Sequence, residues 1–321
     1  MEKSASIYVA GNYGLIGEAI RAQLERAGFE NVLGRQVAES QLTDGAAVEA
    51  FFARTRPEYV FLVGGRSGGI GANQKFPADL MLDNLLVDCH VINNAWHYGT
   101  KKMLYLASSC TYPKFTDQPM RVEFLMTGKL EPTNEPYAVA KLAGLYLCQA
   151  YRRQYQSNFI AAIPANVFGP GDDFSVEDSH VAGALIRRMY EAKVFGEPHV
   201  EIWGSGLARR EFIYSQDLAA ACVFLMDNYE GKEPINVGVG RDWSIRELAE
   251  TIKEVVAYSG ELRFDTSKPD GMPVKLLDSS QLREMGWKPQ TSLRDGLAET
   301  YQGFLREGVF AKGEENARAI L

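Results

Sequence analysis

Three residues in the middle of the chain have the types and spacing needed for proton transfer. Tyr137 and Lys141 are four residues apart, so on a helix both side chains share one face. A nearby ammonium lowers the pKa of a phenol, which can then exchange a proton near neutral pH. Ser108 follows an apolar segment upstream, where its hydroxyl could bond a substrate carbonyl and the tyrosine. Taken singly, the pair also fits an ordinary helix face and Ser108 a turn residue that caps a strand.

A glycine-rich loop opens the chain and suggests a nucleotide partner for this chemistry. The run Gly11-Asn12-Tyr13-Gly14-Leu15-Ile16-Gly17 has the spacing GxxGxxG between a strand-like and a helical segment. Glycines let the backbone approach a pyrophosphate, and the helix N-terminus supplies N–H groups and partial positive charge. The loop therefore predicts a dinucleotide site. The alternative is a structural turn where a helix packs closely on a strand.

The residues after the second strand bear on which dinucleotide binds. NAD-binding proteins usually carry a carboxylate there for the ribose 2′-hydroxyl. This chain reads Leu33-Gly34-Arg35-Gln36 instead, and Arg35 could hold a 2′-phosphate. The sequence favours NADP, with NAD still possible, and a solvated loop charge is the other interpretation of Arg35.

The first half of the chain alternates short apolar runs with helical periods. Such alternation predicts a Rossmann-type, doubly wound parallel sheet of the α/β class. The expected strands are Asn31–Leu33, Tyr59–Val63, Lys102–Ala107, Phe159–Ile163 and a first one at Ile7–Ala10. The expected helices are Glu18–Ala27, Val48–Arg54, Leu80–Tyr98 and Tyr137–Tyr155.

After Gly169 the rhythm becomes mixed, which predicts a smaller α/β lobe at the C-terminal end for the substrate. The elements expected there are helices at Val181–Ala192, Ser215–Asp227 and Ser244–Tyr258 and a strand at Val200–Trp203. We expect residues 1–168 to form the dinucleotide-binding domain, with 213–240 returning to it. Residues 169–212 and 241–321 would form the sugar-nucleotide-binding lobe.

Composition excludes several other classes. The formal charge of −7 lacks the basic field that nucleic-acid binding needs. We find no window near the roughly 20 apolar residues of a membrane span and no signal-peptide pattern at the N-terminus, so we expect a cytoplasmic protein. The four cysteines and four histidines form no CxxC, HxxxH or HExxH pattern, which argues against a disulfide framework or a metal site.

Several further segments, in order along the chain, carry a family resemblance. They include Gly68-Gly69-Ile70, Ser108-Ser109-Cys110, Tyr112-Pro113-Lys114, Leu130 to Ala138, Ser179-His180-Val181, Trp203 to Gly206, Arg210-Glu211-Phe212 and Ser267 to Gly271. Together with the glycine loop, they make the chain resemble the extended short-chain dehydrogenase/reductases from about Ile7 to Leu305. Within these, it is most similar to the GDP-L-fucose synthase family.

The resemblance implies two reactions in one pocket: epimerisation at C3 and C5 of a GDP-4-keto-6-deoxyhexose, then reduction of the C4 ketone by NADPH, giving GDP-L-fucose or a close relative. Ser108, Tyr137 and Lys141 would serve the ketone, and Cys110 and His180 would be the acid/base pair that inverts the carbons. Both side chains titrate near pH 7 if modestly tuned. Without the family, Cys110 would be a core thiol and His180 a loop residue.

The family's binding residues carry over onto further positions. For the cofactor these are Gly11, Tyr13, Gly14, Leu15, Ile16, Gly17, Arg35, Val63, Gly64, Gly65, Tyr137, Lys141, Pro164, Asn166, Val167 and His180. For the GDP-sugar they are Ser109, Arg188, Trp203, Arg210 and Lys275. Arg188 also fits a solvated helix charge, and Trp203 a core residue. The resemblance further implies a homodimer, formed by the helices at Leu80–Tyr98 and Tyr137–Tyr155.

Four places depart from the family pattern. Tyr13 replaces a basic residue of the glycine loop, and Val63-Gly64-Gly65-Arg66-Ser67 replaces Ala-Ala-Ala-Lys-Val. Ile213-Tyr214-Ser215 and Pro170 to Phe174 also differ. These changes leave open another GDP-4-keto sugar, such as a heptose or a dideoxy sugar, and a single-function reductase or epimerase. An inactive NADP-binding regulatory protein is the alternative of another class.

Overall fold

Six parallel strands form the central sheet of the computed structural model, which describes residues 1–11, 13–34, 41–175 and 178–306. Their order across the sheet is β2-β1-β3-β4-β5-β10. The bounds are Ile7–Ala10 for β1, Val32–Leu33 for β2, Tyr59–Leu62 for β3, Lys102–Leu106 for β4, Phe159–Pro164 for β5 and Ile235–Val237 for β10. The doubly wound sheet is confirmed, and β10 is a strand that the sequence pattern did not predict.

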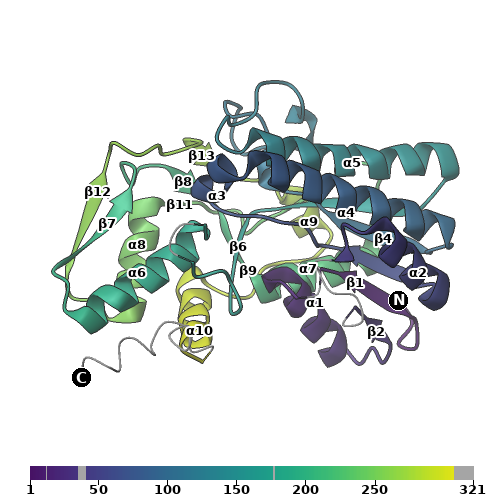
Figure 1. Ribbon diagram of the computed structural model, residues 1–321, viewed down its shortest axis with the longest axis horizontal. Helices are drawn as coiled ribbons and strands as arrows, with labels where there is room; N and C mark the ends of the chain where they lie inside the picture. The colour runs from purple at the N-terminus through teal and green to yellow at the C-terminus, as the bar shows by residue number, and fades with distance from the viewer. Residues whose placement is uncertain (12, 35–40, 176–177, 307–321) are drawn as a thin grey trace.

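Helices cover both faces of this sheet (Figure 1). One layer holds α1, Leu15–Arg26, and α7, Ser215–Asn228. The other holds α2, Gly45–Thr55, α4, Pro77–His97, and α5, Glu135–Tyr155. Helix α4 begins before the expected Leu80, because Pro77 suits the first turn of a helix. Helix α5 likewise carries Pro136 in its first turn.

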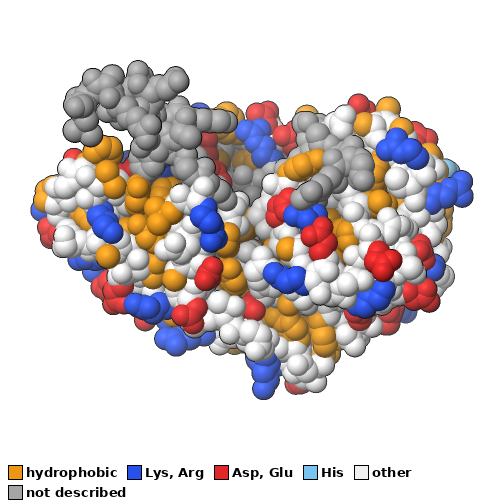
Figure 2. Space-filling model, turned by 90° about the horizontal axis from the view of Figure 1, so that it is seen from below, with side chains coloured by type: hydrophobic (Ala, Val, Ile, Leu, Met, Phe, Trp, Pro, Cys, Tyr) orange, Lys and Arg blue, Asp and Glu red, His pale blue; other side chains and the backbone are white. Residues whose placement is uncertain are grey.

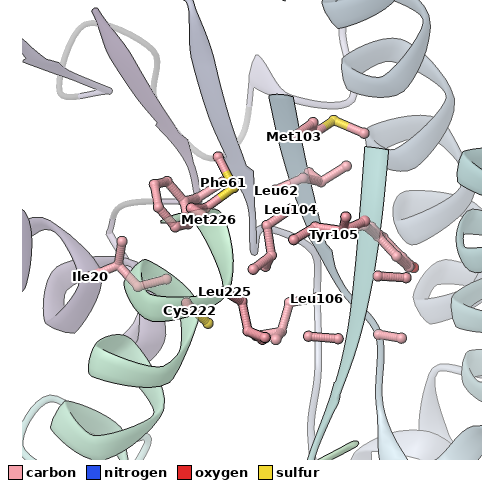
Figure 3. Packing of buried hydrophobic residues seen from close by; sticks show 14 of the residues in the cluster. Ile20, Phe61, Leu62, Met103, Leu104, Tyr105, Leu106, Cys222, Leu225 and Met226 are labelled. Carbon is pink, nitrogen blue, oxygen red and sulfur yellow. The ribbon is translucent and has the colours of Figure 1, made fainter. Parts of the chain in front are cut away.

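The strands are buried because their side chains pack against a helical layer on each face of the sheet. All five residues of β4 are buried, and successive side chains alternate between the faces. Leu104 and Leu106 point toward Leu225 of α7, whereas Tyr105 points the opposite way (Figure 3). An apolar run with one tyrosine therefore places a phenol between the sheet and the layer of α4 and α5.

A second hydrophobic core lies in the other lobe (Figure 1). It is built on α6, Val181–Phe195, α8, Ile245–Val256, and α10, Leu293–Arg306, beside β7, His199–Trp203, and β12, Glu261–Asp265. Helix α8 starts with a capping box between Ser244 and Glu247. Ile186, Leu248 and Leu297 are fully buried in this core.

Short strands join the two lobes. β6, Asn166–Phe168, pairs with β9, Phe212–Tyr214, and β8, Arg209–Arg210, lies between β11, Trp243–Ser244, and β13, Val274–Lys275. The buried carboxylate of Glu211 accepts hydrogen bonds from the backbone N–H groups of Gly240 and Leu277. Two- and three-residue strands leave too little periodicity to be predicted, and a short helix α3, Ile70–Lys75, was missed for the same reason.

The surface and the helices add two observations. Basic and acidic side chains are interspersed on the face seen from below (Figure 2). Within the described ranges, we find that each helix is too short or too polar to cross a membrane.

Candidate active site

The predicted site residues from the first lobe meet at one edge of the sheet. Gly11 follows β1, Val63 follows β3, Ser108 lies after β4, and Asn166 comes after β5. All of these strands are parallel, so their carboxyl ends lie together, where ligands bind in such folds. The Val63 N–H donates to the carbonyl of Ala10 at 3.0 Å, which extends the β1–β3 pairing into the loops.

The glycine loop fits a dinucleotide. Gly11 has φ +98°, and a Cβ placed there would lie 2.3 Å from the Cα of Gly64, so both loops need glycine to approach each other. Helix α1 has Gly14 at its N-cap without a side-chain cap, so the N–H groups of its first turn and its dipole can face a pyrophosphate. Tyr13 is exposed.

The remaining predicted cofactor residues lie in the first turn of α1, directly after β3, at the end of β5 and in β6. Gly17, Gly64 and Pro164 are buried, and Leu15, Ile16, Val63, Gly65, Asn166 and Val167 are half-buried. Arg35 lies outside the described residues.

Ser108 links the end of β4 to the start of α5. Its hydroxyl accepts a hydrogen bond from the Cys110 N–H at 3.2 Å and is hydrogen-bonded with Tyr137. Burial raises the pKa of Tyr137, the negative charge of Cys110 raises it further, and the bond with Ser108 opposes them. The pKa of Tyr137 is therefore above its ordinary value, opposite to the lowering expected from Lys141, because burial of the phenol dominates.

Cys110 lies where three segments converge. Its sulphur accepts hydrogen bonds from Asn134 Nδ2 at 3.2 Å and from Lys275 Nζ at 3.3 Å. Burial alone would raise the pKa of the thiol, but the positive charge of Lys275 and the bond with Ser108 bring it below its ordinary value. The arrangement favours a thiolate, which is the reactive form.

Lys275 lies beside the Cys110 thiol. It was expected as a GDP-sugar contact, and the structure puts its ammonium against the Cys110 thiol. Arg210 is its register partner across β8 and β13, and its charge also lowers the pKa of Cys110. Arg210 Nη2 donates to the carbonyl of Asp270 at 3.0 Å. Two cations therefore flank the thiol.

His180 is the N-cap residue of α6. Its loop rests on Gly69, whose N–H donates to the carbonyl of Asp178 at 2.8 Å. A Cβ at Gly69 would lie 2.5 Å from the carbonyl oxygen of Ser179, which explains the paired glycines. Desolvation of the imidazole is the main cause that lowers the pKa of His180. The positive charge of Lys275 lowers it further, and the negative charge of Asp173 opposes both effects. Lys275 thus tunes both members of the predicted acid/base pair.

A second cluster in the C-terminal lobe surrounds an indole ring. Trp203 is 43% exposed, so it is not a core residue. The Arg188 guanidinium lies 5.8 Å from its ring centroid and the Lys268 ammonium 5.3 Å, both within cation–π range. Ser109, in contrast, is buried and offers little surface to a ligand.

Sequence reasoning missed several of these residues. Asn134 and Lys268 lie in segments that carry the family resemblance. Only the tertiary contacts show that their partners are Cys110 and Trp203. Asp88 lies within the helix expected at Leu80–Tyr98 but was not identified as a site residue, and its Oδ1 lies 4.0 Å from Lys141 Nζ. A carboxylate on the buried face of a helix was the available signal, because such a group needs a partner. Over the described ranges, no three histidine, cysteine or acidic side chains are placed to hold a metal ion.

Comparison with known proteins places this geometry in a family. The model of the NAD dependent epimerase/dehydratase family matches residues 7–238. GDP-L-fucose synthase 1 of Arabidopsis thaliana is 50% identical over 305 residues, covering 95% of this chain and 94% of the plant protein. A GDP-6-OMe-4-keto-L-xylo-heptose reductase from C. jejuni is 32% identical with a TM-score of 0.91, covering 96% of this chain and 99% of its own. A GDP-L-fucose synthetase from Naegleria fowleri bound to NADP is 28% identical with a TM-score of 0.88, covering 97% of both chains.

Proposed function

This chain belongs to the NAD dependent epimerase/dehydratase family, and we propose that it epimerises C3 and C5 of a GDP-4-keto-6-deoxyhexose and then reduces its C4 ketone. The product is GDP-L-fucose or a close relative. The position of Cys110 carries this proposal: a thiol paired with Lys275 lies two residues after Ser108. Ketone reduction uses Ser108, Tyr137 and Lys141, whereas a tuned thiol beside them serves proton transfer at carbon.

The epimerisation follows from the acidity of carbons beside a ketone. Cys110 and His180 exchange protons with C3 and C5, one on each face, which inverts each centre. The enolate oxygen that forms needs hydrogen-bond donors, and Ser108 and Tyr137 are placed at one site to supply them. Tyr137 then gives its proton to the C4 oxygen during reduction, and its raised pKa keeps the phenol protonated at neutral pH.

The cofactor is NADP, which supplies the hydride in its reduced form. The loop at Gly11 and the start of α1 would hold its pyrophosphate, since the backbones of Gly11 and Gly64 approach closely there. The NADP-bound relative from Naegleria fowleri supports this choice. Residues 1–168 with 213–240 hold the dinucleotide, and residues 169–212 with 241–321 hold the sugar nucleotide, with contacts from Arg188, Trp203, Arg210 and Lys275.

A second candidate is the same chemistry, or the reduction alone, on a GDP-heptose. The similarity to the C. jejuni reductase favours it, as does the loop from Gly64 to Ser67. Gly65 has φ +124°, and a Cβ there would lie 2.3 Å from Asn84 Oδ1. The backbone of this loop therefore packs directly against Asn84, where an alanine at position 65 would not fit.

Two further properties accompany the proposal. The protein acts as a homodimer through α4 and α5. The outer face of these helices carries the exposed rings of Trp96 and Tyr155, which stack with their ring centroids 4.3 Å apart. It works in the cytoplasm, because Cys110 must stay a free thiol and that compartment is reducing.

Product analysis in heavy water tests the function. The protein is incubated with NADPH and either GDP-4-keto-6-deoxymannose or a GDP-4-keto-heptose, and deuterium is counted at C3 and C5. Two deuterium atoms in a reduced product support the double epimerase/reductase, and one indicates a single-site epimerase. None indicates a plain reductase, and binding of NADPH without turnover of any keto sugar would support the regulatory alternative.

A further inference from the structure

A buried carboxylate lies behind Lys141, between α4, α5 and β4. Asp88 on α4 is 1% exposed, and its Oδ1 lies 4.0 Å from Lys141 Nζ. Its Oδ2 accepts a hydrogen bond from the Tyr105 hydroxyl at 2.7 Å, and that hydroxyl also lies 3.2 Å from the carbonyl oxygen of Lys141. Lys141 is itself buried, so its ammonium requires a charge partner.

Helix α5 keeps a space for this pair. Gly144 lies within the helix, where glycine is less stable than alanine. A Cβ at Gly144 would lie 2.4 Å from the Tyr105 hydroxyl oxygen and 2.5 Å from Asp88 Oδ2. The glycine therefore makes space for the carboxylate and the phenol, although it lowers the intrinsic stability of the helix.

We propose that Asp88 is a positioning residue for ketone reduction, which holds the Lys141 ammonium in place one helical turn after Tyr137. This inference rests on the proposed function. Asp88 is too buried to touch a substrate, so it acts through Lys141. Tyr105 orients the carboxylate from β4, and Gly144 admits both groups.

The groups that face Asp88 determine its charge. Burial raises the pKa of Asp88 to about 6, while Lys141 and the Tyr105 hydrogen bond pull it down. In turn, its negative charge raises the pKa of Tyr137 and of Cys148 on α5. The carboxylate is therefore charged at neutral pH and becomes neutral as the pH falls through about 6.

A titration without substrate tests the pairing directly. The protein is labelled with ¹³Cε-lysine, and the Lys141 signal, assigned by its loss in Lys141→Met, is followed by NMR from pH 5 to 8. We expect a step near pH 6 that disappears in Asp88→Asn. The hydrogen bond from Tyr105 lowers the pKa of Asp88. Its loss in Tyr105→Phe should raise that pKa, so the step should move to higher pH. A wild-type signal without any step overturns the proposal.

Kinetics of ketone reduction give the functional readout. In Asp88→Asn, kcat should fall about tenfold or more, since small displacements at a reacting centre cost this much, while the KM for the sugar nucleotide stays unchanged. The alkaline limb of the pH profile should move to lower pH, because the pKa of Tyr137 falls without the nearby charge. Asp88→Glu should restore the limb, and Gly144→Ala should lower kcat like Asp88→Asn.

The outcomes separate the two claims. Wild-type protein that reduces no GDP-4-keto sugar contradicts the proposed function and leaves the NMR test of the Asp88 pair intact. An active wild type with an unchanged kcat and pH profile in Asp88→Asn overturns the positioning role. If Asp88→Asn does not fold, the wild-type titration and the Tyr105→Phe shift still decide the question.

Discussion

The ammonium of Lys275 lies 3.3 Å from the sulphur of Cys110, although the two residues are 165 positions apart in the chain. The contact joins β13 to the loop after β4. Strand β13 belongs to the three-stranded sheet β11-β8-β13, the interlobe sheet. The contact lowers the pKa of Cys110, and the same charge lowers the pKa of His180. One lysine therefore lowers the pKa of both members of the predicted acid/base pair.

Replacing this lysine should slow the thiol chemistry. In Lys275→Met the pKa of Cys110 rises, because the charge that lowered it is gone. Alkylation of Cys110 by iodoacetamide at pH 7, followed by mass spectrometry, should slow by roughly tenfold, and deuterium exchange at C3 and C5 should slow with it. Lys288→Met, on an exposed loop, is the matched control. Equal alkylation rates in the two variants would refute the role of the pair.

Removing the thiol should separate the two reactions. A serine hydroxyl hardly ionises near neutral pH, so Cys110→Ser should lose about 100-fold or more of the deuterium exchange and keep part of the direct ketone reduction. Cys89→Ser, at an exposed position on α4, should leave both reactions unchanged. The assignment is wrong if Cys110→Ser still inverts C3 and C5 at the wild-type rate.

The glycine loop should tolerate alanine at one glycine and not at another. Gly11→Ala forces a Cβ to 2.3 Å from Gly64 Cα at φ +98°, which should cost about 3 kcal/mol of unfolding free energy and weaken NADPH binding. At Gly14 the nearest atom to a new Cβ is 4.0 Å away, so Gly14→Ala should keep the melting temperature. Thermal melts and fluorescence titration with NADPH measure both effects, and equal melting temperatures would contradict the close approach.

Cofactor selection should follow the 2′-phosphate. We expect NADPH to be used at least about tenfold more efficiently than NADH, a difference that one charge-assisted contact can supply. Arg35→Ala should raise the KM for NADPH and leave that for NADH unchanged. Initial rates with both cofactors decide the point, and a clear preference for NADH would overturn the NADP assignment.

The outer face of α4 and α5 should govern assembly. Trp96 and Tyr155 are 36% and 42% exposed, and buried charge at such a patch would oppose association. Tyr155→Glu should therefore convert a dimer into a monomer by light scattering after size-exclusion chromatography. Phe195→Glu, at the exposed end of α6, should remain dimeric. A monomeric wild type would rule out the proposed homodimer.

The sequence by itself determined five of the six strands of the central sheet, the glycine loop and the order of the reactive residues. These features depend on neighbouring residues in the sequence. Gly11 directly follows the buried strand β1, and Tyr137 and Lys141 share a face because they are four residues apart on a helix. Apolar runs for β1, β3, β4 and β5 specify a parallel sheet, and parallel strands place Ser108 and Asn166 at one edge.

Only the tertiary structure decided which groups set the charge states of these residues. Burial makes the pKa of Tyr137 rise where local spacing predicted a fall. Lys275 meets Cys110 through the three-stranded interlobe sheet, and Asp88 meets Lys141 through the packing of α4 on α5. Electrostatic interactions depend on distance and burial, which are properties of the folded chain and have no counterpart in the spacing of residues along the sequence.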